Sequence, residues 1–436
     1  MTAGAIADPP AGRRTQLDPG HLDLERVTGR FGTPLYVYDL DVVEGRVAML
    51  RARLPAEVDV AYAVKANPSL GVIATLGALG LGADVASGGE LAAALRAGIP
   101  PERIVMTGPG KRDDELEVAV RARVRAITVE SPGELARLEA IAAALRTGTA
   151  APVPVLLRAA STDAVPAQRV PVIQGDAPRF GMDRADLFAA ATIATGSAHL
   201  ELVGIHGFGA SNVLDAEALV RHAAGTFALA AEIGRTVRRP LRLVDVGGGL
   251  GIPYRDDEPD LDLAALGDGL ARIMASYANN PWLREARLLL EPGRFLVGPA
   301  GAYVTRVLDR KRIAGRAIVT VDGGVHHLLR PALVGQAHRV TVLSDGPGDP
   351  EPLSIAGPLC TGLDVLAASV TLALPHPGAL VVVRDAGAYG FTESMPLFLS
   401  HPTPAEVAVR DGEALLLRAR IDPATWLDAQ HIPPGG

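Results

Sequence analysis

An amine stands at the end of an apolar, strand-like stretch. In AYAVKANP (61–68), Lys65 follows residues that are typical of a buried strand. Lysine is among the side chains least often buried, so it either reaches solvent or does chemistry. A partly desolvated lysine has a lowered pKa, and its neutral amine attacks carbonyl groups. The stretch is therefore compatible with a Schiff base to an aldehyde cofactor and, equally, with a lysine that extends to water.

Other reactive side chains also end strand-like runs. His206 could stack on a planar ring or transfer a proton, or it could be a hydrogen-bonded core residue. Glu291 could pair with a protonated ring nitrogen, or form a salt bridge with Arg294 or Arg158. The full set offers an amine, an imidazole, carboxylates and a guanidinium: Lys65, Asp84, Arg158, His206 and Glu291. Their joint occurrence favours a site over unrelated structural residues.

A glycine run follows a later strand-like stretch, in DVGGGLGIPY (245–254). It is not the dinucleotide fingerprint, because Ile252 stands where that pattern needs its last glycine. Consecutive glycines can expose backbone N–H groups to an anion, although they also form tight turns. The stretch EPGR (291–294) adds Arg294 beside Gly293. Together the two stretches indicate a phosphate site.

The elements that must position these residues form an alternating pattern. Apolar runs alternate with helix-like segments, as in βαβ units, and near-continuous aliphatic runs are typical of strands buried on both faces. Eight such runs predict a (β/α)8 barrel, with its active site at the carboxyl ends of the strands. The strand candidates are 58–65, 83–87, 104–108, 126–130, 154–159, 202–208, 241–249 and 287–293. Ser87 and Ser131 each precede a glutamate by three positions, which predicts capping boxes at two helix starts.

After about residue 300, β-like runs are broken by Gly, Pro and Asp, which predicts an antiparallel β domain. The expected fold class is therefore α/β plus all-β, a (β/α)8 barrel followed by a β barrel or sandwich. The expected domains are a flexible lead-in (1–32), a strand that joins the β domain (33–40), the barrel (41–300) and the β domain (301–436).

Composition limits the possible partners. The net charge of −7 argues against nucleic acid or an anionic membrane as the main partner, and no apolar stretch is long enough to span a bilayer. The single cysteine, Cys360, rules out an intramolecular disulfide and suits a reducing compartment. The N-terminal residues lack the apolar core of a signal peptide. We therefore expect a cytoplasmic protein.

The motifs resemble one known family. The chain resembles the pyridoxal 5′-phosphate-dependent decarboxylases of the alanine racemase-like fold (fold type III), which include the diaminopimelate and ornithine decarboxylases. The resemblance runs from about residue 33 to residue 410. Its motifs occur in family order and are YAVKAN, ADVASGGE, GIHGFGASN, DVGGGLG, EPGR, GPLCTGLD and DAGAYG.

The resemblance implies roles for individual residues. Lys65 matches the lysine that forms the Schiff base, Glu291 the partner of the pyridine nitrogen, and His206 the residue stacked on the ring. Cys360 matches a cysteine that the partner subunit of a homodimer supplies, which protonates the substrate carbon after CO2 leaves. The remaining cofactor positions are Asp84 and Glu90 beside the lysine, Arg158 near the phenolic oxygen, Gly293, and the phosphate-binding set Ser211, Gly248, Gly249, Arg294 and Tyr389.

The departures from the family concern the substrate. The substrate-binding positions implied are Arg294, Arg330, Thr361 and Asp364. An acid usually follows the cysteine and binds the distal amine of the substrate, whereas this chain has Thr361. A neutral hydroxyl cannot form the charge-assisted hydrogen bond that favours an ammonium group. The chain also has Val334 where diaminopimelate decarboxylases have tyrosine, and its GFGASN spacing is similar to that of a branch acting in specialised metabolism, including on carrier-tethered amino acids.

Several functions stay open at this point. The first choice is α-decarboxylation of an amino acid without a distal ammonium group, free or carrier-tethered. Diaminopimelate decarboxylation itself and racemisation on the same scaffold are alternatives, although racemases present a tyrosine base where this chain has Cys360. A non-catalytic binding protein and a Schiff-base aldolase fit less well, because Lys65, Glu291 and Cys360 occur together with the phosphate positions. No metal site is predicted.

Overall fold

Of the chain's 436 residues, the computed structural model describes 13–145, 151–160, 179–343 and 349–433. They divide into two compact units. The first contains Val47–Ile252 and Pro259–Phe295, and the second contains Arg13–Arg46, Pro253–Glu258 and Leu296 onward.

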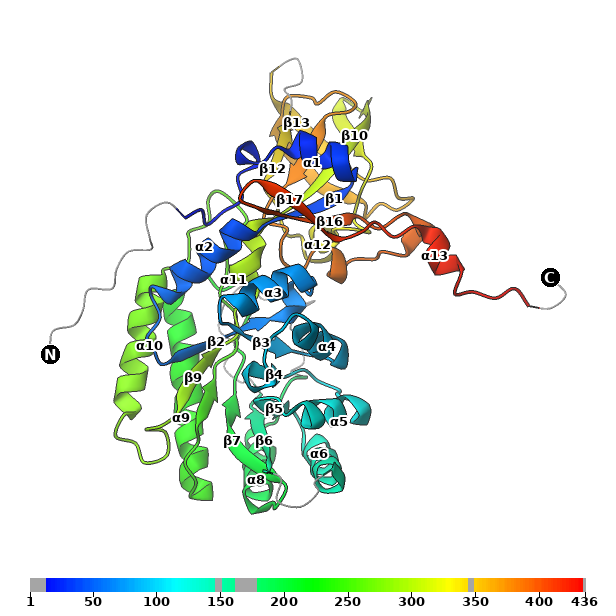
Figure 1. The fold of residues 1–436 in the computed structure, drawn as a ribbon. Coiled ribbons are helices and arrows are strands. Elements are labelled where there is room, and N and C mark those ends of the chain that lie inside the picture. Colours follow the sequence, from blue (N-terminus) through cyan, green and yellow to red (C-terminus); the bar gives the residue numbers. More distant parts are fainter. Residues whose placement is uncertain (1–12, 146–150, 161–178, 344–348, 434–436) are drawn as a thin grey trace. The chain divides into compact units, whose positions relative to one another are not determined.

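The first unit is a closed barrel of eight parallel strands, as the sequence predicted (Figure 1). Each strand pairs with the next in the chain, and the last pairs with the first, with Val60 opposite Leu290. The strands are β2 (Val58–Ala63), β3 (Gly82–Val85), β4 (Ile104–Met106), β5 (Ala126–Val129), β6 (Val153–Arg158), β7 (Leu200–His206), β8 (Leu243–Asp245) and β9 (Arg287–Leu290). Small and aliphatic side chains such as Ala61, Leu156 and Leu243 fill the interior.

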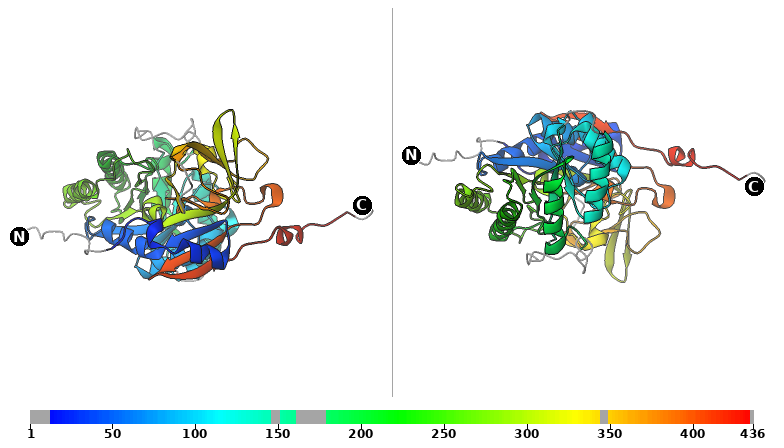
Figure 2. Two further views of the ribbon diagram at one scale, coloured as in Figure 1. Left: turned by 90° about the horizontal axis from the view of Figure 1, so that it is seen from above. Right: turned by 90° about the horizontal axis from the view of Figure 1, so that it is seen from below.

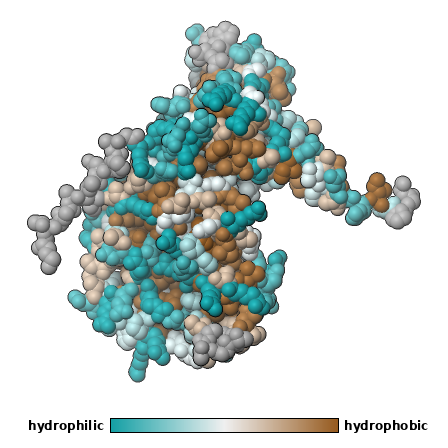
Figure 3. Space-filling view, viewed as in Figure 1, coloured by the Kyte–Doolittle hydropathy of each residue, from teal (hydrophilic) through white to brown (hydrophobic). Residues whose placement is uncertain are grey.

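Helices follow the strands and surround them, as the view from below shows (Figure 2, right). They are α3 (Leu70–Ala78), α4 (Gly88–Arg96), α5 (Asp113–Ala122), α6 (Pro132–Leu145), α8 (Arg184–Gly196), α9 (Ala216–Val237) and α10 (Leu263–Tyr277), with the 3-10 turns η2 (Val64–Ala66) and η3 (Pro101–Arg103). Hydrophilic and hydrophobic residues are interspersed on the face shown in Figure 3. Among the described residues, no helix combines the length and apolarity needed to cross a membrane.

In the two predicted capping boxes, the serine forms its expected hydrogen bond but the glutamate bonds to a different residue. The Ser87 hydroxyl accepts a hydrogen bond from the Glu90 N–H at 3.1 Å, and Ser131 does the same for Glu134. Each glutamate carboxylate, however, accepts from the N–H of the residue before the serine, at 2.7 Å from Ala86 and 3.0 Å from Glu130. These bonds fix the turns that lead from β3 and β5 into their helices.

The second unit is built on a nine-stranded sheet. We predicted an antiparallel domain, but the sheet is mixed, because β1 pairs with β16, and β11 with β13, in parallel. Long connections separate both pairs in the sequence, which is what parallel pairing requires. The strands are β1 (Leu35–Asp39), β10 (Gly301–Ile313), β11 (Arg316–Val321), β12 (Val340–Leu343), β13 (Glu351–Ala356), β14 (Val365–Leu372), β15 (Leu380–Val383), β16 (Ala405–Arg410) and β17 (Glu413–Arg418).

The segment before β1 is ordered where we expected a flexible lead-in. Asp23 caps α1 by accepting from the Arg26 N–H, and Leu17, Leu24 and Val27 are buried in the core beside Leu35. Residues 1–12 of the predicted lead-in lie outside the described residues. The remaining helical elements are η1 (Pro19–His21), α1 (Leu24–Phe31), α2 (Leu40–Arg51), α11 (Arg294–Val297), η4 (Gly298–Ala300), α12 (Arg330–Val334), η5 (Phe391–Glu393), η6 (Phe398–Ser400) and α13 (Pro423–Leu427).

Two adjacent histidines are buried in this second unit. The rings of His326 and His327 lie 3.7 Å apart between centroids, and His401 lies 5.1 Å from His326. His327 is held between the Tyr303 hydroxyl at 3.1 Å and the Pro402 carbonyl at 3.0 Å. Burial and the neighbouring histidines lower the pKa of His326 to about 4 and that of His327 to about 2.

We therefore expect the second unit to lose stability in mild acid. The unfolded chain binds protons at histidines below about pH 6.5, whereas the folded chain resists protonation at His326 until about pH 4. Each such histidine lowers the free energy of unfolding by up to about 1.4 kcal/mol per pH unit across that window. Urea unfolding from about pH 7 to about pH 5 measures this slope.

The control separates these histidines from the acidic groups. His326→Phe keeps an aromatic ring and removes the titration, so the slope becomes shallower. His376→Phe, at an exposed position, leaves the slope unchanged. Equal slopes for wild type and His326→Phe contradict the prediction.

Candidate active site

Every barrel strand delivers a polar side chain at its carboxyl end. Parallel register places Arg158 opposite His206, and His206 opposite Asp245, so these neighbours project to the same side. The eight residues lie at or just after the ends of β2 to β9 in turn: Lys65, Asp84, Thr107, Glu130, Arg158, His206, Asp245 and Glu291.

Lys65 lies on the short turn η2, directly after β2. Its Nζ atom is 2.8 Å from Oδ2 of the buried Asp84, while 44% of its side chain remains exposed. The Thr107 hydroxyl donates to the other oxygen of Asp84. Glu90 lies nearby, where burial, together with the negative charge of Asp84, raises its pKa. The amine is therefore held in place by a buried acid and yet remains accessible.

Arg158 is fixed by a buried ion pair. Its guanidinium donates to Glu130 at 2.5 Å, and both side chains are nearly inaccessible. The guanidinium also lies 4.9 Å from the ring centroid of Phe180. Glu130 in addition accepts from the Gly181 N–H at 3.2 Å. This network holds one positive charge at a defined place on the rim of the barrel.

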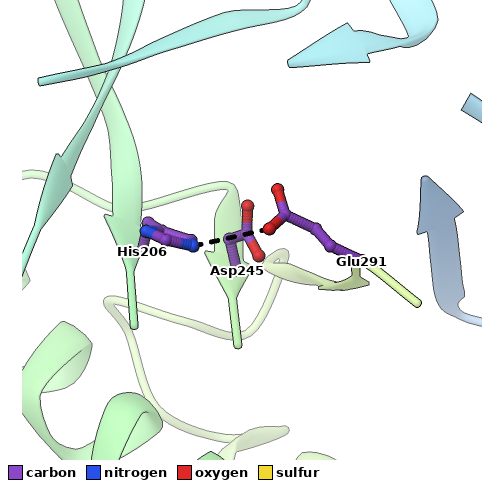
Figure 4. Close-up of side chains that lie close together, drawn as sticks. All are labelled: His206, Asp245 and Glu291. Atoms are coloured by element: carbon purple, nitrogen blue, oxygen red, sulfur yellow. Dashed lines mark ion pairs between the residues drawn. The ribbon is translucent and has the colours of Figure 1, made fainter. Parts of the chain in front are cut away.

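Three buried side chains meet at the ends of β7, β8 and β9 (Figure 4). His206 Nε2 lies 3.5 Å from Glu291 Oε2, and in the described part of the chain neither ring nitrogen makes a hydrogen bond. Burial opposes ionisation of Glu291, but His206 and Lys65 outweigh it and lower the pKa of this carboxyl to about 2. Burial and the charge of Glu291 raise the pKa of Asp245 well above its usual value. Of the two carboxyl groups, that of Glu291 is therefore the anion and that of Asp245 is not.

The glycines predicted to bind phosphate form a crowded backbone cradle. A Cβ at Gly248 would lie 2.2 Å from the Glu291 carbonyl oxygen, and Gly249 has φ +95°. The loops after β7 and β8 are joined by a hydrogen bond from the Val213 N–H to the Gly249 carbonyl at 2.8 Å. The structure brings Arg294 to the same loops, with its Nη2 atom 3.5 Å from the Ser211 hydroxyl.

Gly293 packs against the lysine turn. A Cβ at this position would lie 2.8 Å from Cβ of Ala66, the residue after Lys65. EPGR therefore has a glycine here because the segments following the first and last barrel strands approach each other closely.

The other predicted residues belong to the second unit. Arg330 is buried, and its Nε atom is 2.8 Å from Glu393. Its guanidinium also lies over the Tyr389 ring, at 4.6 Å from the centroid, and donates to Gln336 at 3.1 Å. Arg330 and Tyr389 are thus brought together, with Glu393 as a partner that the sequence did not indicate.

Cys360 and Thr361 lie on a tight turn, and the cysteine is exposed. We predicted that Asp364 contacts substrate, but its two oxygens accept backbone N–H groups, at 2.8 Å from Val325 and 2.6 Å from Leu359. This geometry supports a role for Asp364 in holding the turn that carries Cys360.

Sequence reasoning missed Thr107, Glu130 and Asp245. Thr107 and Glu130 directly follow β4 and β5, and Asp245 is the last residue of β8. The signal that could have found them is the rule already applied elsewhere: the polar residue that ends each strand of a parallel barrel faces the site.

Comparison with known proteins agrees with this geometry. Residues 40–298 match the family model described as the pyridoxal-dependent decarboxylase, pyridoxal binding domain. The chain belongs to the pyridoxal-dependent decarboxylases. It is 33% identical over 410 residues to the L-glutamyl-[BtrI acyl-carrier protein] decarboxylase of Niallia circulans, covering 91% of this chain and 94% of the relative.

Diaminopimelate decarboxylases are similar to the chain as well. That of Aquifex aeolicus is 33% identical over 400 residues and covers 92% of each chain. The solved structure of the M. jannaschii diaminopimelate decarboxylase with L-lysine matches with a TM-score of 0.87 and 27% identity, covering 96% of this chain and 97% of that one. The chain is therefore an amino-acid decarboxylase of the diaminopimelate decarboxylase family, and its cofactor is pyridoxal 5′-phosphate.

The barrel residues fit this cofactor. An accessible amine suits its aldehyde, and a buried anionic carboxylate suits its ring nitrogen. The crowded glycine cradle beside Arg294 suits its phosphate. His206, Asp245 and Glu291 each offer a ligand atom within 4.8 Å of the others, which would also suit a metal ion. We assign these residues to the pyridoxal site, since the other parts of that site lie around them.

We expect Gly248→Ala to weaken cofactor binding by at least about fivefold. Its Cβ would displace the backbone at Glu291, and overpacking of this kind costs about 1–3 kcal/mol. Gly196→Ala, at the end of α8, is the matched control and keeps normal binding, because no atom of the described residues lies within 4 Å of the added Cβ. Absorbance titration with pyridoxal phosphate measures both variants, and equal affinities refute the assigned cradle.

Proposed function

We propose that the chain decarboxylates, at the α-carbon, an amino acid that has no distal ammonium group and is tethered to a carrier protein. The observation that carries this proposal is Thr361, a neutral residue directly after Cys360 where the family resemblance leads us to expect an acid. An ammonium group buried without a carboxylate partner loses its hydration without replacement.

Two acids of the same unit, Asp364 and Glu393, are already engaged with other groups of the chain. Asp364 uses its two oxygens to hold the backbone of the turn. Glu393 is paired with the buried guanidinium of Arg330 at 2.8 Å. A substrate that is neutral or acidic at its far end suits this surface better than one with a distal amine.

The comparison with relatives supports the same substrate class. The Niallia circulans protein is named as acting on an L-glutamyl group held by an acyl-carrier protein. That group ends without an ammonium. The diaminopimelate decarboxylases are about equally identical to this chain, so overall similarity does not choose between the two substrates and Thr361 carries the distinction.

The proposed mechanism assigns a task to each barrel residue. When bound, pyridoxal phosphate supplies an electron sink for the electron pair left as CO2 departs. Lys65 would hold the cofactor through its amine, with Asp84 orienting Nζ. Glu291, as an anion, would keep the ring nitrogen protonated, and His206 would contact the ring. Arg158 would supply a positive charge for the phenolic oxygen.

The remaining residues bind the cofactor's phosphate and complete the site from a second copy. The proposed phosphate ligands are Ser211, Gly248, Gly249, Arg294 and Tyr389, with Gly293 a further cofactor position. Arg294 and Arg330 are the proposed partners of substrate carboxylates. We propose a homodimer in which the exposed Cys360 of one copy serves the site of the other. The cysteine S–H gives its proton to the α-carbon after CO2 leaves. The single cysteine supports a cytoplasmic location.

Lys65→Ala is expected to abolish CO2 release and the visible absorbance of the lysine-bound cofactor, because no other amine is assigned to the aldehyde. Lys311→Ala, at an exposed position of β10, keeps both signals. Substantial turnover by Lys65→Ala would rule out the proposed attachment site.

A CO2-release assay over matched substrates tests the substrate class. We expect turnover of carrier-tethered glutamyl groups, and at least about tenfold lower turnover of free lysine and diaminopimelate, since a charge-assisted hydrogen bond is worth about 1.5–3 kcal/mol. Thr361→Glu supplies the missing acid and raises activity on the two diamines, while Thr361→Ser does not. Efficient turnover of diaminopimelate by the wild-type chain makes it a diaminopimelate decarboxylase and overturns the proposal.

A further inference from the structure

Asp245 is a buried acid for which the family resemblance assigned no role. It is the last residue of β8, and its side chain is inaccessible to solvent. Its Oδ1 atom accepts a hydrogen bond from the Gly247 N–H at 2.8 Å. In the part of the chain that the structure describes, its Oδ2 atom has no hydrogen-bond partner, and Glu291 Oε1 has none either. The two carboxylates lie next to each other in Figure 4.

A single proton would satisfy both unpartnered oxygens. Two carboxylates in contact in a buried site cannot both ionise, because each charge repels the other and neither is hydrated. If one carboxyl group is protonated, its O–H donates to the other. One hydrogen bond then replaces a repulsion, and both buried oxygens gain a partner.

The surroundings decide which residue carries the proton. Glu291 faces the imidazole of His206 at 3.5 Å and the positive charge of Lys65. Asp245 faces the negative charges of Glu291 and Asp84, and among the described residues its hydrogen-bond donor is the Gly247 N–H. The opposite pKa shifts of the two groups agree with this arrangement.

We propose that Asp245 is a positioning residue that is protonated in the working enzyme and donates its O–H to Glu291 Oε1. This bond leaves Glu291 negatively charged and orients its other oxygen, Oε2, toward the side of His206. This inference rests on the proposed function, in which the anionic Glu291 would keep the ring nitrogen of the cofactor protonated. Asp245 thus supports the anion without adding a second negative charge beside the ring.

The proposal distinguishes two substitutions at the same position. Asparagine is neutral and has the same shape as a protonated aspartate, so its amide N–H can donate to Glu291 while its carbonyl accepts from Gly247. Asp245→Asn therefore keeps cofactor affinity within about threefold. Asp245→Ala removes the donor to a charged group, which weakens cofactor binding by about tenfold to hundredfold.

The protonated state is tested directly by infrared spectroscopy of the purified holoenzyme, without substrate. The difference spectrum between wild type and Asp245→Asn is expected to contain the carbonyl stretch of a protonated carboxylic acid. Asp59→Asn is the control and shows no such band, because Asp59 is ionised between Arg125 at 2.5 Å and Arg287 at 2.6 Å, and both arginines lower its pKa.

The proposal is overturned if the difference spectrum lacks the band, or if Asp245→Asn binds pyridoxal phosphate as weakly as Asp245→Ala. If Glu291→Gln loses the carboxylic acid band and Asp245→Asn keeps it, the proton is on Glu291. That result also overturns the proposal. The spectroscopic result does not depend on Asp245→Ala folding. Since no amino-acid substrate is used, failure here is distinguishable from failure of the proposed substrate class.

Discussion

Pairing of β2 with β9 closes the barrel, and the candidate site depends on that closure. It brings Lys65, which follows the first barrel strand, into the same electrostatic environment as Glu291, which follows the last. The close approach of Gly293 to the lysine turn results from the same closure. An amine and an acid from opposite ends of the domain sequence can therefore act on one small molecule.

The site is a set of buried charges that compensate one another. Asp84 accepts from both Lys65 and Thr107, and Glu130 from Arg158. Breaking such a pair is costly, because one partner would remain charged and buried. The same compensation leaves Lys65 accessible and, within the part of the chain that the structure describes, leaves the ring nitrogens of His206 without a hydrogen bond, so these groups remain available to a ligand. The paired carboxylates thus hold the site rigid, while Lys65 and His206 are the side chains left to bind a ligand.

Much of the barrel could be predicted from the sequence, because fully buried parallel strands have nearly continuous apolar sequences and end in polar residues. Lys65, Asp84, Arg158, His206 and Glu291 were found in this way. The pairings could not be predicted, since they depend on which strand ends are adjacent and on exact register.

The second unit shows a different limit. Alternating β-like runs indicated strands, but not the parallel pairs of β1 with β16 and β11 with β13, which join segments far apart in the chain. A carboxylate such as that of Asp364 could bind a ligand, yet both of its oxygens accept backbone N–H groups, from Val325 and Leu359. The sequence alone does not show which acidic side chains are used to hold the backbone in this way.

The hydrogen bonds of Asp364 that anchor the turn carrying Cys360 and Thr361 have a consequence for how such enzymes diverge. Two backbone N–H groups anchor the turn through Asp364, whereas the side chain of the partly exposed Thr361 accepts one longer hydrogen bond, at 3.3 Å from the Leu363 N–H. Under the proposed function, a single substitution at this position changes substrate preference while the charged network of the barrel stays the same. Selection for a new substrate can therefore act on one small loop without lowering the stability of the barrel.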